Sequence, residues 1–550
     1  NLIYNDSSVR SQLVPFSLPI GVLVALPVLS VGANLFAGAA GDAWSHLVAT
    51  VLPEYIVNSL LLAVIVGFGV VVVGVSTAWL TAMTDFPGRR VFEWALLLPL
   101  ALPAYVMAYV YTDLLQFVGP VQTFLRESFG WKRSDYWFPE IRSLGGAAAM
   151  FVCALYPYVY LITRTAFLER GSSTFEAGRS MGLTPWAAFM RVSLPLARPA
   201  VVAGVALVLM ETLADYGTVA YFAVPTFTTG IYRAWFSLGD RIAAAQLAGA
   251  LLTFVLCLLA LERASRGRAR FHQTGRRQGE RRALQGASAW LASLACLLPL
   301  VLGFLLPGGL LFRLALAEGD SEFGVRYGVL AGNSFLVAGV TALLAVALAV
   351  LLAYAQRLSS VPAVRIVNRV VALGYAVPGA VIAVGVLIPV TRLDHWLAAA
   401  WQETFGTNPG LLLTGGIAAL VYAYLARFLS IALQTVESSL LRMTPSMDAA
   451  AQSLGCGPGE TLRRVHLPLI RGSLFTAGLL VFVDVMKELP ATLVMRPFNF
   501  NTLATQTYTL AADERLAEAS TAALAIVAVG LLPVFLLARE VVRGTQRGAA

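Results

Sequence analysis

Four carboxylates inside long apolar stretches are the residues of this sequence best suited to chemistry. They form two pairs, Glu211 with Asp215 and Asp484 with Glu488, and the second pair follows the first at an offset of 273 residues. A spacing of four places two side chains on one face of a helix. Carboxylates within a membrane are costly and usually functional, and their oxygens suit a hard cation. We therefore expect the four to line a translocation pathway.

A structural role for the same carboxylates is also compatible with the sequence. Lys487 can neutralise Asp484 or Glu488, and the segment Asp215-Tyr216-Gly217 can end a helix. The four cysteines form no CxxC pair, and the four histidines are scattered rather than spaced as metal ligands. No metal site is therefore assigned from the sequence.

The elements that carry these residues must lie in a membrane. Hydrophobic residues make up 58% of the 550 residues and charged residues only 13%, whereas a soluble domain carries roughly 25% charge. This composition excludes fibrous, disordered and nucleic-acid-binding proteins. Stretches long enough to span a bilayer number twelve. They are 17–39, 55–82, 93–118, 144–168, 197–222, 242–261, 288–314, 327–355, 366–391, 411–434, 472–491 and 516–538.

Basic residues in the loops predict the orientation. Alternate loops, together with the C-terminal tail, hold 24 Lys and Arg, and the intervening loops hold 10. Cytoplasmic loops carry the excess of positive charge, so we expect both termini in the cytoplasm. The arginine-rich segment 263–285 between the sixth and seventh stretches is expected to be a linker at the anionic inner leaflet, with no role in nucleic-acid binding.

The two halves of the chain, 1–262 and 286–550, are internal repeats. Asn58 recurs as Asn333 and Pro103 as Pro378, both at an offset of 275 residues. Six spans in each half is an even number, so both halves cross the membrane in the same direction and the repeat is parallel. A translocation pathway is then expected between the halves.

The strongest repeated motif lies in the loops 169–198 and 436–471. In the first copy, Ser173 and Glu176 form a capping-box pattern that predicts a helix start, and Gly182 can end that helix in the left-handed conformation. Thr184 and the following proline predict a second short helix. The second copy begins at Thr444-Pro445 and reaches its turn glycine at Gly455.

These loops resemble the EAA motif of binding-protein-dependent ABC importer permeases. The resemblance implies an all-α integral membrane protein with about 12 transmembrane helices in two parallel six-helix repeats, the type I ABC importer permease fold. It also implies that the short helix docks on an ATPase subunit. The residues assigned to this coupling role are Glu176, Ala177, Gly178, Gly182, Asp448, Ala449, Ala450 and Gly455. Ala449 stands where the motif has glutamate, and Asp448 lies one residue earlier.

A segment near the end narrows the resemblance. Residues 484–493 and 496–505 are similar to fused permeases of ferric iron importers, and related permeases for thiamine, sulfate and phosphonate share parts of them. The resemblance implies that this chain lies in the bacterial inner membrane. It also implies two partners, a periplasmic binding protein and an ABC ATPase that is expected to be a homodimer.

We expect this chain to bind no cofactor and to have no ATPase site. A phosphate-binding P-loop needs Gly-Lys-Ser/Thr, and the only lysines, Lys132 and Lys487, follow Trp and Met. The partner would therefore use the ATP. A major-facilitator-type secondary transporter is the alternative, because the segment 85–90 resembles the loop motif of that family, although the second half does not repeat it.

Overall fold

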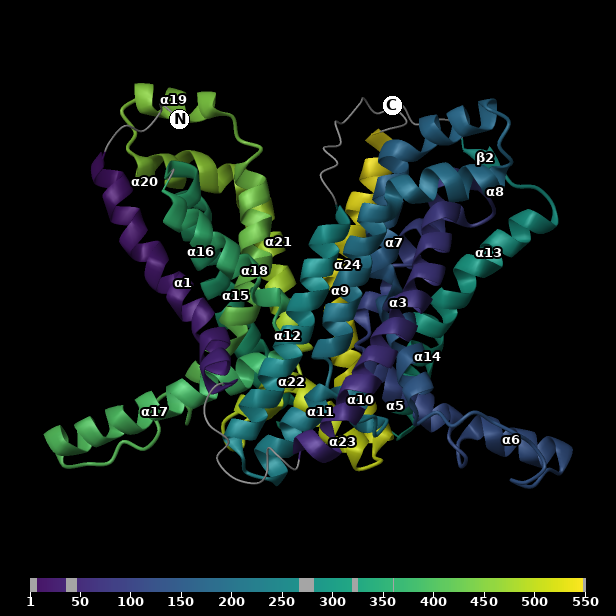
Figure 1. The fold of residues 1–550 in the computed structure, drawn as a ribbon, viewed down its shortest axis with the longest axis horizontal. Coiled ribbons are helices and arrows are strands. Elements are labelled where there is room, and N and C mark those ends of the chain that lie inside the picture. Colours follow the sequence, from purple (N-terminus) through teal and green to yellow (C-terminus); the bar gives the residue numbers. More distant parts are fainter. Residues whose placement is uncertain (1–6, 36–46, 267–280, 319–324, 360, 548–550) are drawn as a thin grey trace. The chain divides into compact units, whose positions relative to one another are not determined.

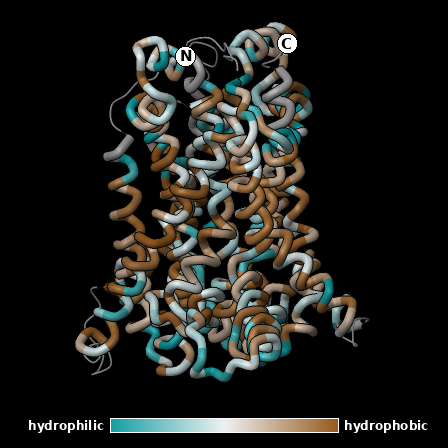
Figure 2. The backbone as a smooth tube through the Cα atoms, turned by 90° about the vertical axis from the view of Figure 1, so that its right-hand side faces the viewer, coloured by the Kyte–Doolittle hydropathy of each residue, from teal (hydrophilic) through white to brown (hydrophobic). Residues whose placement is uncertain are grey.

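The computed structural model describes residues 7–35, 47–266, 281–318, 325–359 and 361–547 (Figure 1). In these ranges, 11 helices are long and apolar enough to cross a membrane, or 12 if one bent pair counts as a span. Hydrophobic residues predominate along most of the length of these helices (Figure 2). The predicted all-α membrane fold is therefore confirmed.

The described chain divides into two compact units. The first combines residues 1–46, 230–252 and 324–505, and the second combines residues 47–229, 253–323 and 506–550. Unit 1 contains α1 (Ser7–Leu35), α15 (Val325–Leu358), α16 (Pro362–Ala372), η5 (Gly374–Ala376), α17 (Gly379–Phe405), α18 (Ala418–Leu440), α19 (Pro445–Ser453), α20 (Pro458–Thr461), η6 (Leu462–His466), α21 (Leu467–Met486), α22 (Pro490–Met495) and η3 (Arg233–Ser237).

Unit 2 contains most elements of the first half of the chain. These are α3 (Leu52–Met83), β1 (Thr84–Asp85), α4 (Arg89–Ala95), η1 (Leu98–Ala101), α5 (Ala104–Leu115), α6 (Pro120–Phe129), α7 (Leu144–Ser180), α8 (Pro185–Ala188), η2 (Phe189–Ser193), α9 (Leu194–Ala214) and α10 (Gly217–Tyr221). It also contains β2 (Arg282–Ala283), α13 (Ala287–Leu300), η4 (Val301–Leu305), α14 (Leu306–Glu318) and α24 (Leu516–Arg547). The unit boundaries cut α11 (Phe227–Tyr232), α12 (Arg241–Arg266) and α23 (Leu503–Ala512).

The compact units do not coincide with the sequence halves. The first helix of the chain, α1, packs on α16 and α17 of the second half, and α14 and α24 pack on each other within unit 2. Each unit is therefore built mainly from one half of the sequence and includes at least one packed helix from the other half. The boundaries 1–262, 263–285 and 286–550 describe the sequence repeat rather than the packing units.

Equivalent hydrogen bonds in the two units reflect the repeat. The side-chain amide of Asn58 donates to the carbonyl of Pro225 at 3.0 Å in unit 2. In unit 1, the amide of Asn333 donates to the carbonyl of Asn501, also at 3.0 Å. Each bond ties the second span of a half to the loop after its fifth span.

The third expected span is broken in both halves. Leu102 and Val377 are extended because each precedes a proline, which disfavours helical backbone. In unit 2 the helices on either side of the break, 89–101 and 104–129, meet at 90°, and α6 extends away from α5 (Figure 1). The expected straight spans 93–118 and 366–391 are therefore wrong in detail.

Candidate coupling loops and translocation pathway

The first coupling loop, residues 169–198, continues the fourth span without a break. Helix α7 runs through to Ser180, so the helix start predicted at Ser173 is wrong, and the side chain of Ser173 lies outside the described residues. The left-handed turn predicted at Gly182 is present, with φ of 86°. The backbone N–H of Ala187 then donates to the Thr184 hydroxyl at 3.2 Å, which caps α8 as expected.

The docking face of this loop is exposed and its opposite face is held by aromatic rings. Glu176 and Ala177 are exposed, whereas Gly178 is buried. Phe175 lies one residue earlier, with its ring centroid 5.2 Å from that of Trp79 at the end of α3. The rings of Phe167 and Phe189 pack on the same indole. The exposed residues assigned to coupling therefore lie on a helix that aromatic contacts hold against Trp79 of α3.

The second coupling loop, residues 436–471, contains a separate short helix. Helix α19 begins at Pro445, as predicted, and presents Ala449 and Ala450 to solvent. Its turn residue Gly455 has φ of 83°, which matches Gly182 in the first loop. The two loops thus share their turn geometry, although only the first carries an exposed acidic side chain at the motif position.

Asp448 points inward and does not take the place of the missing glutamate. It is 7% exposed. Its carboxylate accepts a hydrogen bond from Arg357 Nη2 at 2.7 Å and lies 2.7 Å from His466 Nε2. The His466 ring in turn packs edge-on against Tyr354, whose hydroxyl donates to the carbonyl of Pro458. This buried ionic cluster fastens α19 to the end of α15 and to η6.

The two loops are thus held by different chemistry at equivalent positions. At the offset of 273 residues, Asp448 corresponds to Phe175 and His466 to Ser193. At the offset of 275, Tyr354 corresponds to Trp79. Sequence reasoning assigned no role to His466 or Arg357, although comparison at these offsets would have aligned their neighbours Asp448 and Tyr354 with Phe175 and Trp79 of the first loop.

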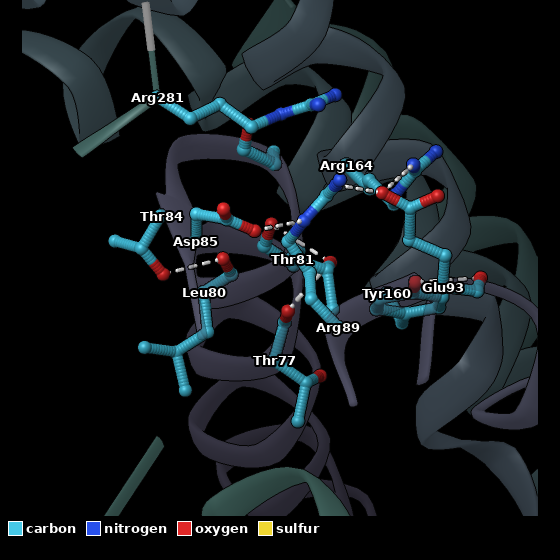
Figure 3. A network of polar contacts seen from close by, with 12 residues as sticks. Thr77, Leu80, Thr81, Thr84, Asp85, Arg89, Glu93, Tyr160, Arg164 and Arg281 are labelled. Carbon is cyan, nitrogen blue, oxygen red and sulfur yellow. Dashed lines mark hydrogen bonds and ion pairs between the residues drawn. The ribbon is translucent and has the colours of Figure 1, made fainter. Parts of the chain in front are cut away.

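Figure 3 shows a second polar network in unit 2, which includes Arg89, Glu93 and Arg164. The buried carboxylate of Glu93 forms ion pairs with Arg89 and with Arg164 of α7, the latter at 3.4 Å. Arg281 approaches from the linker and donates to the carbonyl of Ala82 at 3.3 Å. Burial lowers the pKa of Arg281, and the nearby charge of Arg89 lowers it further. The network therefore joins α4, α7 and the linker.

Backbone pairing fixes the linker at the same place. Strand β1 pairs in parallel with β2, and Leu284 donates its backbone N–H to the carbonyl of Asp85 at 2.9 Å. In unit 1 the positions of Glu93 and Arg164 are occupied by Asn368 and Glu437, which hydrogen-bond at 2.7 Å. The helix contact is thus kept in both halves, but the arginine cluster is confined to the first.

The first pair of pathway carboxylates lies at the end of α9. The helix stops at Ala214, and Asp215 is extended with ψ of 140°, so the expected stripe on one helix face does not form. Asp215 accepts the backbone N–H of Thr218 at 2.8 Å. Both Glu211 and Asp215 are half-buried, and neither forms an ion pair with the described side chains.

The second pair is neutralised locally. Asp484 lies 2.9 Å from Lys487 Nζ. Glu488 lies beyond the end of α21, is 5% exposed, and pairs with Arg427 of α18 at 3.2 Å. It also accepts the backbone N–H groups at the start of α22. The two acidic pairs therefore occupy equivalent positions but differ in their balance of charge.

No group of three or more His, Cys, Asp or Glu side chains in the described ranges has an arrangement that could hold a metal ion. The carboxylate pairs lie in different units, with Glu211 and Asp215 in unit 2 and Asp484 and Glu488 in unit 1. The environment of each carboxylate pair is therefore described within its own unit.

Comparison with known proteins agrees with this architecture. Residues 70–261 match the family described as binding-protein-dependent transport system inner membrane component. The Fe(3+)-transport system permease protein FbpB 2 of Haemophilus influenzae is 27% identical over 88% of this chain and 90% of its own length.

Shorter permeases align with part of the chain. The sulfate transport system permease protein CysT of Escherichia coli is 33% identical over 28% of this chain and 52% of its own length. The molybdenum transport system permease protein ModB of the same organism is 28% identical over 34% of this chain and 81% of its own length. The match to this family also argues against the alternative of a major-facilitator-type secondary transporter. Residues 70–261 therefore form a permease domain of the binding-protein-dependent transport family, and the whole multi-pass chain is similar to a ferric-transport permease of comparable length.

Proposed function

We propose that this permease carries ferric iron from a periplasmic binding protein into the cytoplasm. The observation that carries the proposal is the breadth of the similarity to the Fe(3+)-transport permease, which extends over 88% of the chain. The sulfate and molybdenum permeases align with about a third of the chain or less. The unpaired carboxylates Glu211 and Asp215 add support, since a cation entering a low-dielectric cavity needs compensating negative charge.

In this proposal the chain transmits work done by a separate ATPase. The coupling residues Glu176, Ala177, Gly182 and Gly455 would contact the ATPase on the side where the loops carry most of the arginines. The chain has no Gly-Lys-Ser/Thr sequence, so it lacks the lysine that a P-loop requires. Purified alone, it should hydrolyse no ATP, whereas the assembled complex should hydrolyse ATP and respond to a loaded binding protein.

Transport of an oxyanion is the second candidate, favoured by the sulfate and molybdenum relatives. Positive charge along the route favours an oxyanion, and neither Glu211 nor Asp215 forms an ion pair with a basic side chain in the described ranges. Uptake assays on proteoliposomes that contain the permease, its ATPase and its binding protein separate the two candidates. ATP-dependent accumulation of labelled ferric iron supports the first candidate. Accumulation of sulfate or molybdate without iron supports the second.

A further inference from the structure

Five tyrosines of unit 2 lie on the segments next to Asp215, and we call them the phenol cluster. They come from α5, from the link between α9 and α10, from the end of α10, and from the part of α23 that belongs to unit 2. The members are Tyr105, Tyr109, Tyr216, Tyr221 and Tyr508. The rings of Tyr109 and Tyr221 are 4.6 Å apart between centroids, and the hydroxyl oxygens of Tyr216 and Tyr508 are 3.4 Å apart.

Tyr109 is the member that points to a ligand. Its side chain is completely buried, and its hydroxyl has no hydrogen-bond partner among the described residues. Its ring centroid lies 4.6 Å from that of Tyr221 and 5.8 Å from that of Tyr105, and α5 packs on α10, which begins two residues after Asp215. A buried hydroxyl without a partner is costly, and in a native protein such a group calls for an explanation such as a water or an ion.

The charge of the cluster selects the kind of ligand. Asp215 has no cationic partner among the described side chains, and the phenols around it are neutral oxygen groups. The guanidinium of Arg142 lies 5.1 Å from the ring centroid of Tyr221 and pairs with Glu514. Carboxylate and phenol oxygens are hard donors, so the cluster suits a highly charged, oxygen-seeking cation rather than an oxyanion.

The second half lacks the cluster, so it is not a packing feature that the repeat requires. The positions equivalent to four of the tyrosines hold apolar residues: Ala380, Val384, Leu489 and Val494. The equivalent of Asp215 is Glu488, whose charge is balanced by Arg427. Among the described residues, unit 2 therefore combines these phenol oxygens with a carboxylate that forms no ion pair, whereas the equivalent carboxylate of unit 1 is paired.

The members of the cluster differ in their exposure. Tyr105 and Tyr109 are buried, whereas Tyr216, Tyr221 and Tyr508 are only partly buried, as is Asp215. A cation can therefore meet the outer members first and reach the buried hydroxyl of Tyr109 last.

The geometry points to a transient ferric iron site on the translocation route, with Asp215 and Tyr109 as ligands and Tyr216 and Tyr508 at its entrance. This inference rests on the proposed transport of ferric iron. On binding, the O–H bond of Tyr109 breaks, an iron–oxygen bond forms, and the proton leaves to water. The iron stays in the ferric state, so no oxidant or reductant is needed.

Absorption spectroscopy tests the site directly, because a phenolate bound to ferric iron gives a charge-transfer band in the visible range. We expect the full-length permease in lipid nanodiscs to develop this band when titrated with ferric nitrilotriacetate. Tyr109→Phe should abolish or strongly reduce the band, and Asp215→Asn should weaken iron binding at least tenfold. Tyr508→Phe, at the partly exposed entrance, serves as a second variant if Tyr109→Phe folds poorly, and it should slow the appearance of the band without abolishing it.

Tyr156→Phe is the matched control, since Tyr156 in α7 is also fully buried with a hydroxyl that lacks a partner among the described residues. Its electrostatic neighbours are Tyr160, Cys153 and Cys296, without Asp215. The control should keep the band. An unchanged band in Tyr109→Phe, equal loss in the control, or no band in the wild type overturns the site.

Uptake measurements separate this inference from the proposed function. Wild-type uptake of ferric iron without a phenolate band refutes the site and leaves the transport assignment standing. Uptake of sulfate or molybdate without ferric iron refutes both. Ferric iron uptake that falls at least tenfold in Tyr109→Phe, but less than twofold in Tyr156→Phe, supports both.

Discussion

Asp448 Oδ1 and His466 Nε2 lie 2.7 Å apart beneath the second coupling loop, and Arg357 completes the contact from the end of α15. The first loop reaches the same position with the ring of Phe175 packed on Trp79. The two halves therefore have similar turns that rest on different side-chain contacts. The difference yields predictions that separate docking from support.

The first prediction concerns Asp448 and Glu176. Asp448→Ala leaves the guanidinium of Arg357 without its carboxylate, so the permease should lose about 3–5 kcal/mol of stability. Glu176→Ala removes an exposed side chain and should leave the melting temperature within about 1 °C, because surface changes rarely exceed about 0.5 kcal/mol. Its effect should instead be loss of transport-coupled ATPase activity. Thermal unfolding in detergent and ATPase assays of the complex provide the two readouts. Equal melting temperatures for both variants would contradict the support role of Asp448.

The second prediction concerns the turn glycines. Gly182→Val and Gly455→Val place a β-branched residue at a φ above +80°, where such side chains are strongly strained. Each variant should insert in the membrane but lose at least tenfold in coupled uptake. Gly459→Val is the control, since Gly459 lies in the second loop in open space without a positive φ. Normal uptake in both turn variants would show that the loops do not depend on this geometry.

The third prediction compares the two acidic pairs. Glu211→Gln with Asp215→Asn removes two carboxylates that lack ion pairs in the described structure, and should abolish ferric iron uptake while binding-protein docking survives. Asp484→Asn with Lys487→Gln removes a mutually neutral pair and should reduce uptake less than threefold. Labelled-iron uptake at matched protein levels is the measurement. Similar losses in both double variants would show that charge balance does not distinguish the pairs.

The combined variant Glu211→Gln with Asp484→Asn tests the wider pathway proposal. It removes one carboxylate from each half and should abolish uptake without preventing assembly with the ATPase. Because Asp484 pairs with Lys487, we expect most of the loss to come from the change at Glu211. A failure of the variant to fold would assign both carboxylates a structural role.

The fourth prediction concerns the polar network of Arg89, Glu93 and Arg164. Glu93→Gln leaves the neighbouring guanidiniums of Arg89 and Arg164 without their shared buried carboxylate, with Arg281 close by, and should destabilise the permease by about 3 kcal/mol. Asp85→Asn removes an exposed carboxylate from the same network and should cost less than about 1 kcal/mol. Differential scanning fluorimetry can compare them. An equal effect of the two changes would show that burial of Glu93 adds nothing.

The sequence was sufficient for the membrane fold, the repeat and the turn glycines, because each depends on local composition or on spacing. Hydropathy located the spans, and the positions of Gly182 and Gly455 required only glycine at a helix end. The offset between the repeats was equally visible in Asn58 and Asn333, which make equivalent bonds.

Features that depend on tertiary packing were not accessible in this way. The capping-box pattern at Ser173 predicted a helix start. Instead, α7 continues through this position to Ser180, and Phe175 within it packs on Trp79. The spacing of Glu211 and Asp215 suggested one helix face, yet α9 ends between them. The partners of Glu488 and Asp448, Arg427 and Arg357, come from helices distant in sequence, so neither ion pair could be read from local spacing.

Uptake by the reconstituted system tests the central claim most directly. The permease would be assembled with its ATPase and binding protein in proteoliposomes that contain ATP at the ATPase face. Accumulation of radiolabelled ferric iron, sulfate and molybdate would then be compared in parallel. We predict ATP-dependent accumulation of ferric iron at least tenfold above the ATP-free control, unaffected by excess sulfate or molybdate. ATP-dependent accumulation of either oxyanion with no accumulation of iron would contradict the account.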